Sequence, residues 1–137
     1  MSEITLLDSD ILSYLLPGQQ NVVARAQKYL AEHEHFHFSL ITRYEILCGL
    51  KARNAVVQIE RFDHFCAENS VVPLTDEIIQ VASSIYARLY QQGTIINDAD
   101  ILIAATTIAH DMTLATNNTA HFSRVGELHL DNWAEDA

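Results

Sequence analysis

Hydrophobic residues follow two alternating patterns along the chain. Short apolar runs and alternations, which are typical of buried strands, occupy residues 4–7, 35–40, 71–74, 113–116 and, more weakly, 127–130. Between these runs, apolar residues recur every three or four positions. That spacing predicts helices over residues 11–16, 20–33, 42–52, 54–68 and 75–92, and a further helix that begins at 97 or 98.

The order of these segments predicts the fold class. Thr75 is placed to cap the helix that Gly93 ends, and Asn97 or Asp98 is placed to cap the next one. Short strands that alternate with helices predict an α/β fold with a mostly parallel sheet and helices on both faces. No repeat, low-complexity tract or linker interrupts the pattern, so we expect one domain.

Polar residues follow or precede several of the predicted strands. In a parallel α/β sheet the ligand site lies beyond the carboxyl ends of the strands, where such side chains converge. The candidates are Asp8, Glu45, Asp98, Asp100, Asn117 and Asn118. Crowded carboxylates resist ionisation unless a cation offsets their charge, and oxygen-rich sites suit Mg²⁺ or Mn²⁺. Such an ion can bind a phosphate oxygen and stabilise a leaving oxygen.

Each candidate also has a purely structural interpretation. Thr42 and Glu45 match a capping box that places Glu45 in the first turn of its helix. Asp98 and Asp100 favour a helix N-terminus through the helix dipole alone, and Asp8 is a plausible N-cap. The asparagines after the strand at 113–116 suit a turn. Only their convergence at one edge favours the metal site.

Charge and composition narrow the choice of partners. The 137 residues hold 8 Lys and Arg against 18 Asp and Glu, a net charge of −10. Nucleic acid repels such a chain unless a metal ion, a local basic patch or a basic partner intervenes. No apolar run approaches the ~20 residues of a membrane span, and no signal peptide is visible at the start. Two cysteines form no disulfide framework, so we expect a cytoplasmic protein away from membranes.

Four segments in order resemble the motifs of PIN-domain ribonucleases, specifically the VapC-type toxins of type II toxin–antitoxin systems. They are LLDSDIL at 6–12, TRYEILCGL at 42–50, NDADILIAA at 97–105 and LATNNTAHF at 114–122, and residues 125–133 resemble the closing strand and tail. The resemblance spans essentially the whole chain. It implies one PIN domain over residues 1–137, a three-layer α/β/α sandwich with a central sheet of about four to five strands.

The resemblance also implies roles for individual residues. Asp8, Glu45 and Asp100 match the acidic residues that hold Mg²⁺, or alternatively Mn²⁺, and that carry catalysis. Asn118 stands where many members have a fourth acid, which implies a weaker or water-mediated ligand. Asp98 lies close enough in sequence to act as a helper ligand.

Other residues are expected to support that site. Ser9 and Thr116 are candidates to orient a water molecule at the metal. Arg43 and Lys51 are our candidates for weak RNA contacts, although Arg43 also suits a plain surface position.

The implied function is a metal-dependent endoribonuclease that inhibits translation and is neutralised by a VapB-type antitoxin. Because the chain is acidic, a structured RNA such as tRNA, recognised by shape, is the expected substrate. The family also implies a homodimer and a larger assembly with the antitoxin. Ile79, Tyr86 and Tyr90 form a stripe that suits either such an interface or ordinary core packing.

Two other functions remain open at this point. A PIN fold that binds RNA or a partner without cleavage would not need crowded carboxylates. An Asp-based phosphohydrolase would use Asp8 and Asp10 as a DxD motif, but it needs a lysine after a later strand. The chain's lysines, Lys28 and Lys51, do not occupy such a position.

Overall fold

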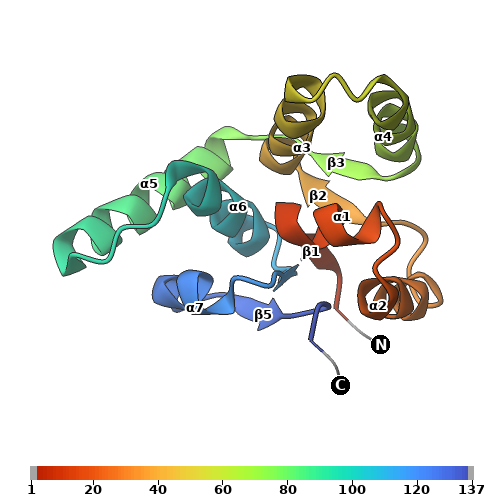
Figure 1. Cartoon of the computed structure of the whole chain (residues 1–137). Coiled ribbons are helices and arrows are strands. Elements are labelled where there is room, and N and C mark those ends of the chain that lie inside the picture. The colour runs from red at the N-terminus through yellow and green to blue at the C-terminus, as the bar shows by residue number, and fades with distance from the viewer. Residues whose placement is uncertain (1–2, 136–137) are drawn as a thin grey trace.

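Five short strands alternate with helices in the computed structural model, which describes residues 3–135 (Figure 1). The strands are β1 (Thr5–Leu7), β2 (His37–Ser39), β3 (Ser70–Val72), β4 (Thr113–Ala115) and β5 (His129–Asp131). The helices are α1 (Ser9–Leu15), α2 (Gln20–Leu30), α3 (Leu40–Ala52), α4 (Val56–Glu68), α5 (Asp76–Gln92), α6 (Asp98–Ala109) and α7 (Thr119–Phe122), followed by the 3₁₀ helix η1 (Ser123–Val125).

The strands form one parallel sheet in the order β3-β2-β1-β4-β5. Leu6 of β1 pairs in register with Leu114 of β4, and Leu7 pairs with Ala115. The chain leaves β1 toward β2 and β3 on one side and returns at β4 on the other. The point between β1 and β4 is therefore the switch of strand order, beyond whose carboxyl ends ligands bind in such sheets.

Helices cover both faces of the sheet, as the sequence predicts (Figure 1). Leu6 and Leu114 pack on one face with α5, α6 and α7, whereas Leu7 and Ala115 pack on the other with α1, α2 and α4. Successive strand residues point to opposite faces, so each strand contributes to two hydrophobic cores. The predicted three-layer α/β/α architecture and its parallel sheet are confirmed.

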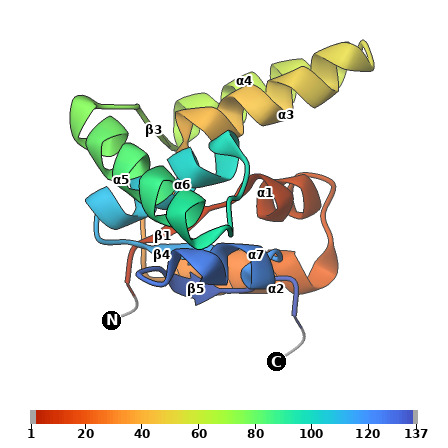
Figure 2. The same ribbon diagram turned by 90° about the vertical axis from the view of Figure 1, so that its left-hand side faces the viewer.

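Helices α3 and α4 form a hairpin that projects beyond the sheet (Figure 2). Their connection is short, and Asn54 adopts a positive φ of 52° there. Leu50 and Phe62 pack into the core shared with α1, which anchors the base of the hairpin. The hairpin thus forms a wall beside the carboxyl ends of the strands.

Several predicted boundaries shift by a few residues, and the start of α3 has a local cause. The helix predicted from residue 42 begins at Leu40, because the Ser39 hydroxyl caps it by accepting from the Ile41 N–H. The helix predicted to residue 33 ends at Leu30. The caps expected at Thr75 and Asn97 and the left-handed end at Gly93 are confirmed.

Within the described residues, no helix is long and apolar enough to cross a membrane.

Candidate functional site

Asp8 lies at the centre of the site because two neighbouring strands end beside it. The Asp8 backbone N–H donates to the Ala115 carbonyl, which extends the pairing of β1 with β4 by one residue. Its carboxylate caps α1 by accepting from the Ser9 N–H at 2.8 Å, and it accepts from the Thr116 hydroxyl at 2.8 Å. Burial, followed by the charge of Asp10, raises the pKa of Asp8 from 3.8 to about 7.

Asp10 is a second carboxylate at this edge. It accepts from the Ile11 N–H at 2.7 Å and from the Asn117 N–H at 3.0 Å, so it connects α1 to the loop after β4. Burial raises the pKa of Asp10. The sequence motifs predict no ligand role for Asp10, although it stands two residues after Asp8 in the same motif.

Glu45 reaches the site from α3, and its local role differs from the prediction. The Ser9 hydroxyl donates to Glu45 Oε1 at 2.6 Å and lies 3.1 Å from the hydroxyl of Thr42. The predicted capping box is wrong: Ser39 caps α3, so Thr42 is inside the helix and buried, and Glu45 lies beyond the first turn. The Glu45 carboxylate is therefore free of the capping role and faces α1.

Asp100 approaches from the start of α6. The Asn97 side chain caps this helix by accepting from the Asp100 N–H, and it donates to Asp100 Oδ2 at 2.9 Å. Burial raises the pKa of Asp100, while nearby His121 lowers it and the charges of Glu45 and Asp10 raise it. Asp98, two residues before Asp100 in the same turn, is exposed.

Asn118 and His121 complete this side of the site. The Asn118 N–H donates to the Thr116 hydroxyl at 3.0 Å, and its side-chain Nδ2 lies 2.8 Å from His121 Nδ1. The same His121 nitrogen is 3.6 Å from Asp100 Oδ2. The sequence motifs predict no role for His121, although its position three residues after Asn118 places both in one turn.

We call Asp8, Asp10, Glu45 and Asp100 the acidic cluster. Within residues 3–135, the ion pairs formed by arginine join Arg25 to Asp131 and Arg88 to Glu127, and no lysine or arginine pairs with the acidic cluster. Its mutual repulsion is therefore left without a basic counter-charge, apart from His121 when that ring is protonated.

The side chains of the acidic cluster do not form a complete metal-binding site by themselves. Across the part of the chain that the structure describes, no three His, Cys, Asp or Glu side chains are arranged to hold one metal ion together. Mg²⁺ commonly retains several waters and uses one or two carboxylates plus substrate phosphates. The carboxylate oxygens and their uncompensated charge fit an ion of that kind.

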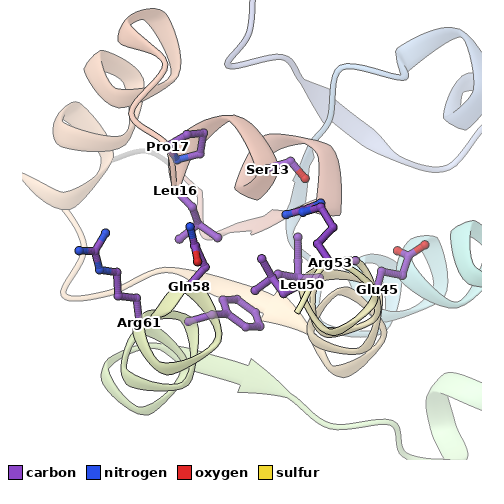
Figure 3. Close-up of a pocket in the computed structure, with 11 residues that line it drawn as sticks. Ser13, Leu16, Pro17, Glu45, Leu50, Arg53, Gln58 and Arg61 are labelled. Atoms are coloured by element: carbon purple, nitrogen blue, oxygen red, sulfur yellow. The ribbon is translucent and has the colours of Figure 1, made fainter. Parts of the chain in front are cut away.

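The predicted RNA contacts, Arg43 and Lys51, lie elsewhere on α3. Both line a shallow pocket of about 500 Å³ with Tyr44 and Leu47, and the Arg43 side chain approaches the thiol of Cys66 on α4. A different pocket, between α1 and the α3–α4 hairpin, contains Glu45 (Figure 3).

The chain matches a known protein family over most of its length. The model for the PIN domain matches residues 5–128. The chain belongs to the PIN domain family. Among curated PIN-domain relatives, Ribonuclease VapC2 of Rickettsia felis is 28% identical over 131 residues, which cover 95% of this chain and 98% of the relative. Ribonuclease VapC1 of Methanocaldococcus jannaschii is 34% identical over 92 residues, or 67% of this chain and 65% of the relative.

Solved structures show the same PIN fold. The chain matches VapBC2 from Rickettsia felis bound to a promoter DNA fragment with a TM-score of 0.84 and 26% identity, over 95% of this chain and 98% of that one. FitAcB from Neisseria gonorrhoeae matches with a TM-score of 0.83 and 25% identity, over the same shares. The resemblance to VapC-type proteins that the four motifs indicate is confirmed.

Proposed function

We propose that this PIN domain is a divalent-metal-dependent endoribonuclease that hydrolyses RNA phosphodiesters. The observation that carries the proposal is the state of Asp8, a buried carboxyl whose pKa burial and Asp10 raise to about 7 and which has no basic partner. A cation beside such a group would offset its charge and favour the ionised form. The curated relatives named as ribonucleases support the same activity.

Asp8, Glu45 and Asp100 would hold Mg²⁺ or, alternatively, Mn²⁺ in this proposal. Asn118 would assist through a water molecule, and the exposed Asp98 is an auxiliary ligand. The bound ion would supply positive charge at the scissile phosphate and favour ionisation of an attacking water.

The surrounding groups hold the carboxylates in place. Thr116 donates to Asp8, Ser9 donates to Glu45, and Asn97 donates to Asp100. Ser9 and Thr116 are also our candidates to orient a water molecule at the metal, and each hydroxyl donates to a carboxylate of the site. In this proposal they act as positioning residues, which keep the oxygens aimed without changing their charge.

The substrate that we propose is a structured RNA, such as tRNA, whose cleavage would inhibit translation. The net charge of −10 weakens binding to arbitrary RNA, so recognition would depend on shape and on a few local contacts.

We further propose a VapB-type antitoxin as partner, because the Rickettsia felis and Neisseria gonorrhoeae structures that this chain resembles are VapBC2 and FitAcB. A basic antitoxin segment would complement the acidic cluster.

A homodimer through α5 is also proposed, within a larger assembly that includes the antitoxin. Ile79, Tyr86 and Tyr90 are exposed on that helix, so the alternative of core packing is wrong for this stripe. Tyr86 and Tyr90 stack with their ring centroids 6.1 Å apart, which gives the exposed face a flat aromatic surface.

Two features bear on the cellular location and the domain organisation of the protein. Cys48 and Cys66 are free thiols, which fits the cytoplasmic location that we propose. The PIN match over residues 5–128 supports treating residues 1–137 as one domain.

One observation favours the alternative of a non-catalytic binding module. The described residues contain no preformed group of three metal ligands. An Asp-based phosphohydrolase lacks comparable support, because Lys28 and Lys51 are exposed on α2 and α3.

Cleavage assays and metal titration together test the proposal. Purified RNAs, including tRNA, are incubated with the chain and Mg²⁺ or Mn²⁺, with and without EDTA, and Mn²⁺ binding is measured by calorimetry. We expect cleavage that EDTA abolishes, and loss of both cleavage and Mn²⁺ binding in Asp8→Asn and Asp100→Asn. Full cleavage by both variants would refute the assignment, and RNA binding without Mn²⁺ binding would identify the binding module.

A further inference from the structure

A pocket of about 580 Å³ lies between α1 and the α3–α4 hairpin, and Glu45 of the acidic cluster is part of its wall (Figure 3). Arg53 shares the α3 side with Glu45, whereas Gln58 and Arg61 project from α4. Leu16 at the end of α1 provides an apolar surface opposite them. The pocket therefore joins one carboxylate of the candidate site to two guanidinium groups.

Arg53 and Arg61 are exposed and available for a ligand. The ion pairs of arginine in residues 3–135 use Arg25 and Arg88, and neither pocket arginine takes part in one. In a chain with a net charge of −10, two unpaired cations beside a candidate catalytic carboxylate form a local exception to the acidic surface. The guanidinium fork matches phosphate oxygens in a bidentate geometry.

Gly49 explains how Arg53 lies beside the acidic cluster. Glu45 and Gly49 of α3 and Arg53 at its C-cap are spaced by four residues, so Arg53 follows the helix face that carries Glu45 and Gly49. A side-chain Cβ at Gly49 would have Arg53 Nη1 as its nearest neighbour, at 3.8 Å. Arg53 therefore folds back over Gly49 in the direction of Glu45. The helical backbone at Gly49 does not require glycine, and the missing side chain keeps this part of the pocket open.

We propose that Arg53 and Arg61 bind backbone phosphates of the RNA strand that leads to the acidic cluster. This inference rests on the proposed function and assigns the substrate groove of that same site. A single strand fits the pocket because its phosphates meet the two guanidinium groups, while its sugars and bases contact Gln58 and the apolar surface at Leu16. The negative charge of the rest of the chain would repel the RNA strand. These two arginines would therefore set the path of the strand toward the acidic cluster.

Binding measurements on an inactive chain test this assignment. Asp100→Asn is combined with Arg53→Gln or Arg61→Gln, and fluorescence anisotropy follows a labelled RNA that the wild-type chain cleaves. Each phosphate contact on a single strand contributes about 0.7 to the slope of log K against log salt, which corresponds to about fivefold in affinity at 0.1 M salt. We expect each substitution to reduce the slope and the affinity by about these amounts.

Matched variants show whether the effect is local. Lys28→Gln removes one exposed positive charge on α2 and should leave the slope unchanged. Arg43→Gln and Lys51→Gln remove the cations of the other pocket on α3. If these two variants weaken RNA binding while Arg53→Gln and Arg61→Gln do not, the assignment is wrong.

Obstruction of the pocket gives a second readout in the active enzyme. Gly49→Met should raise KM for RNA with little change in kcat, with folding checked by circular dichroism.

If the wild-type chain cleaves no RNA with Mg²⁺ or Mn²⁺, the proposed function itself fails. If it cleaves RNA and the arginine variants match it in affinity and kcat/KM, only this inference fails. Loss of antitoxin binding alone would show a protein-binding groove and also overturn it.

Discussion

The raised pKa of Asp8 predicts that Asp8→Asn stabilises the metal-free protein above pH 8. Burial is the largest cause of the increase from 3.8 to about 7, the charge of Asp10 adds to it, and hydrogen bonds from Thr116 and Ser9 oppose it. Asparagine has nearly the same shape and no charge. The substitution therefore removes the buried charge while the packing around residue 8 is kept.

The magnitude follows from the pKa. The pKa of Asp8 differs by about 3 between the unfolded and the folded chain. At 1.36 kcal/mol per pKa unit, ionised Asp8 therefore lowers the free energy of unfolding by about 4 kcal/mol. Asparagine has one carbonyl oxygen where Asp8 has two acceptors, so either the Ser9 N–H or the Thr116 hydroxyl loses its partner, which offsets about 1–2 kcal/mol of the gain from removing this charge. We expect a net stabilisation of about 2–3 kcal/mol, which for a chain of this size raises Tm by on the order of 10 °C.

The sign of the pH dependence is also determined. The folded carboxyl keeps its proton to a higher pH than the unfolded one, so the stabilising contribution is complete below about pH 4 and is lost as the pH rises toward 7 and above. Asp10 and Asp100, whose pKa values burial also raises, act in the same direction. The free energy of unfolding should therefore decrease from pH 4 to pH 8 in EDTA.

Thermal unfolding by circular dichroism from pH 4 to pH 9 measures this effect. Wild type, Asp8→Asn and a control, Glu60→Gln on the exposed surface of α4, are compared in EDTA and then in Mg²⁺. Mg²⁺ should stabilise wild type most at high pH and Asp8→Asn little. A wild-type Tm that does not fall with pH, or an Asp8→Asn variant less stable than wild type at pH 8.5, would refute the reasoning.

Three further substitutions test other parts of the site. Asp100→Asn should reduce RNA cleavage by about a thousandfold or more, and exposed Asp98→Asn by less than about tenfold; equal losses in single-turnover assays would contradict the assignment of Asp100. Thr116→Val should lower the free energy of unfolding in urea by about 1–3 kcal/mol, because Asp8 loses a donor and the Asn118 N–H loses its acceptor; an unchanged urea midpoint would count against this contact. Gly49→Ala should raise stability by about 0.5–1 kcal/mol, since the added Cβ meets only an ordinary contact, and a lower Tm would show hidden strain.

The sequence determined the elements and the main acidic residues. Hydrophobic periodicity depends on neighbouring positions, and local caps such as Thr75 and Asn97 depend on hydrogen bonds within one turn, so both can be predicted without tertiary contacts. Asp8 was accessible to the same reasoning, because the end of a parallel strand is where ligands bind.

Only the tertiary structure decided which side chains meet at the site. The hydrogen bond from Thr116 to Asp8 joins residues 108 positions apart, and it exists because β4 returns beside β1. Ser39, rather than Thr42, caps α3, and this start leaves Glu45 free to face Ser9.

The tertiary structure also decided which cations lie beside the carboxylates. The hairpin of α3 and α4 places Arg53 and Arg61 in the pocket with Glu45, and it places Arg43 and Lys51 in a different one. Local patterns specify what each segment becomes, whereas the order of the strands and the packing of the helices set the face that each segment turns toward the others. Strand order and helix packing depend on contacts between residues far apart in the sequence, so the spacing of residues within one segment does not encode them.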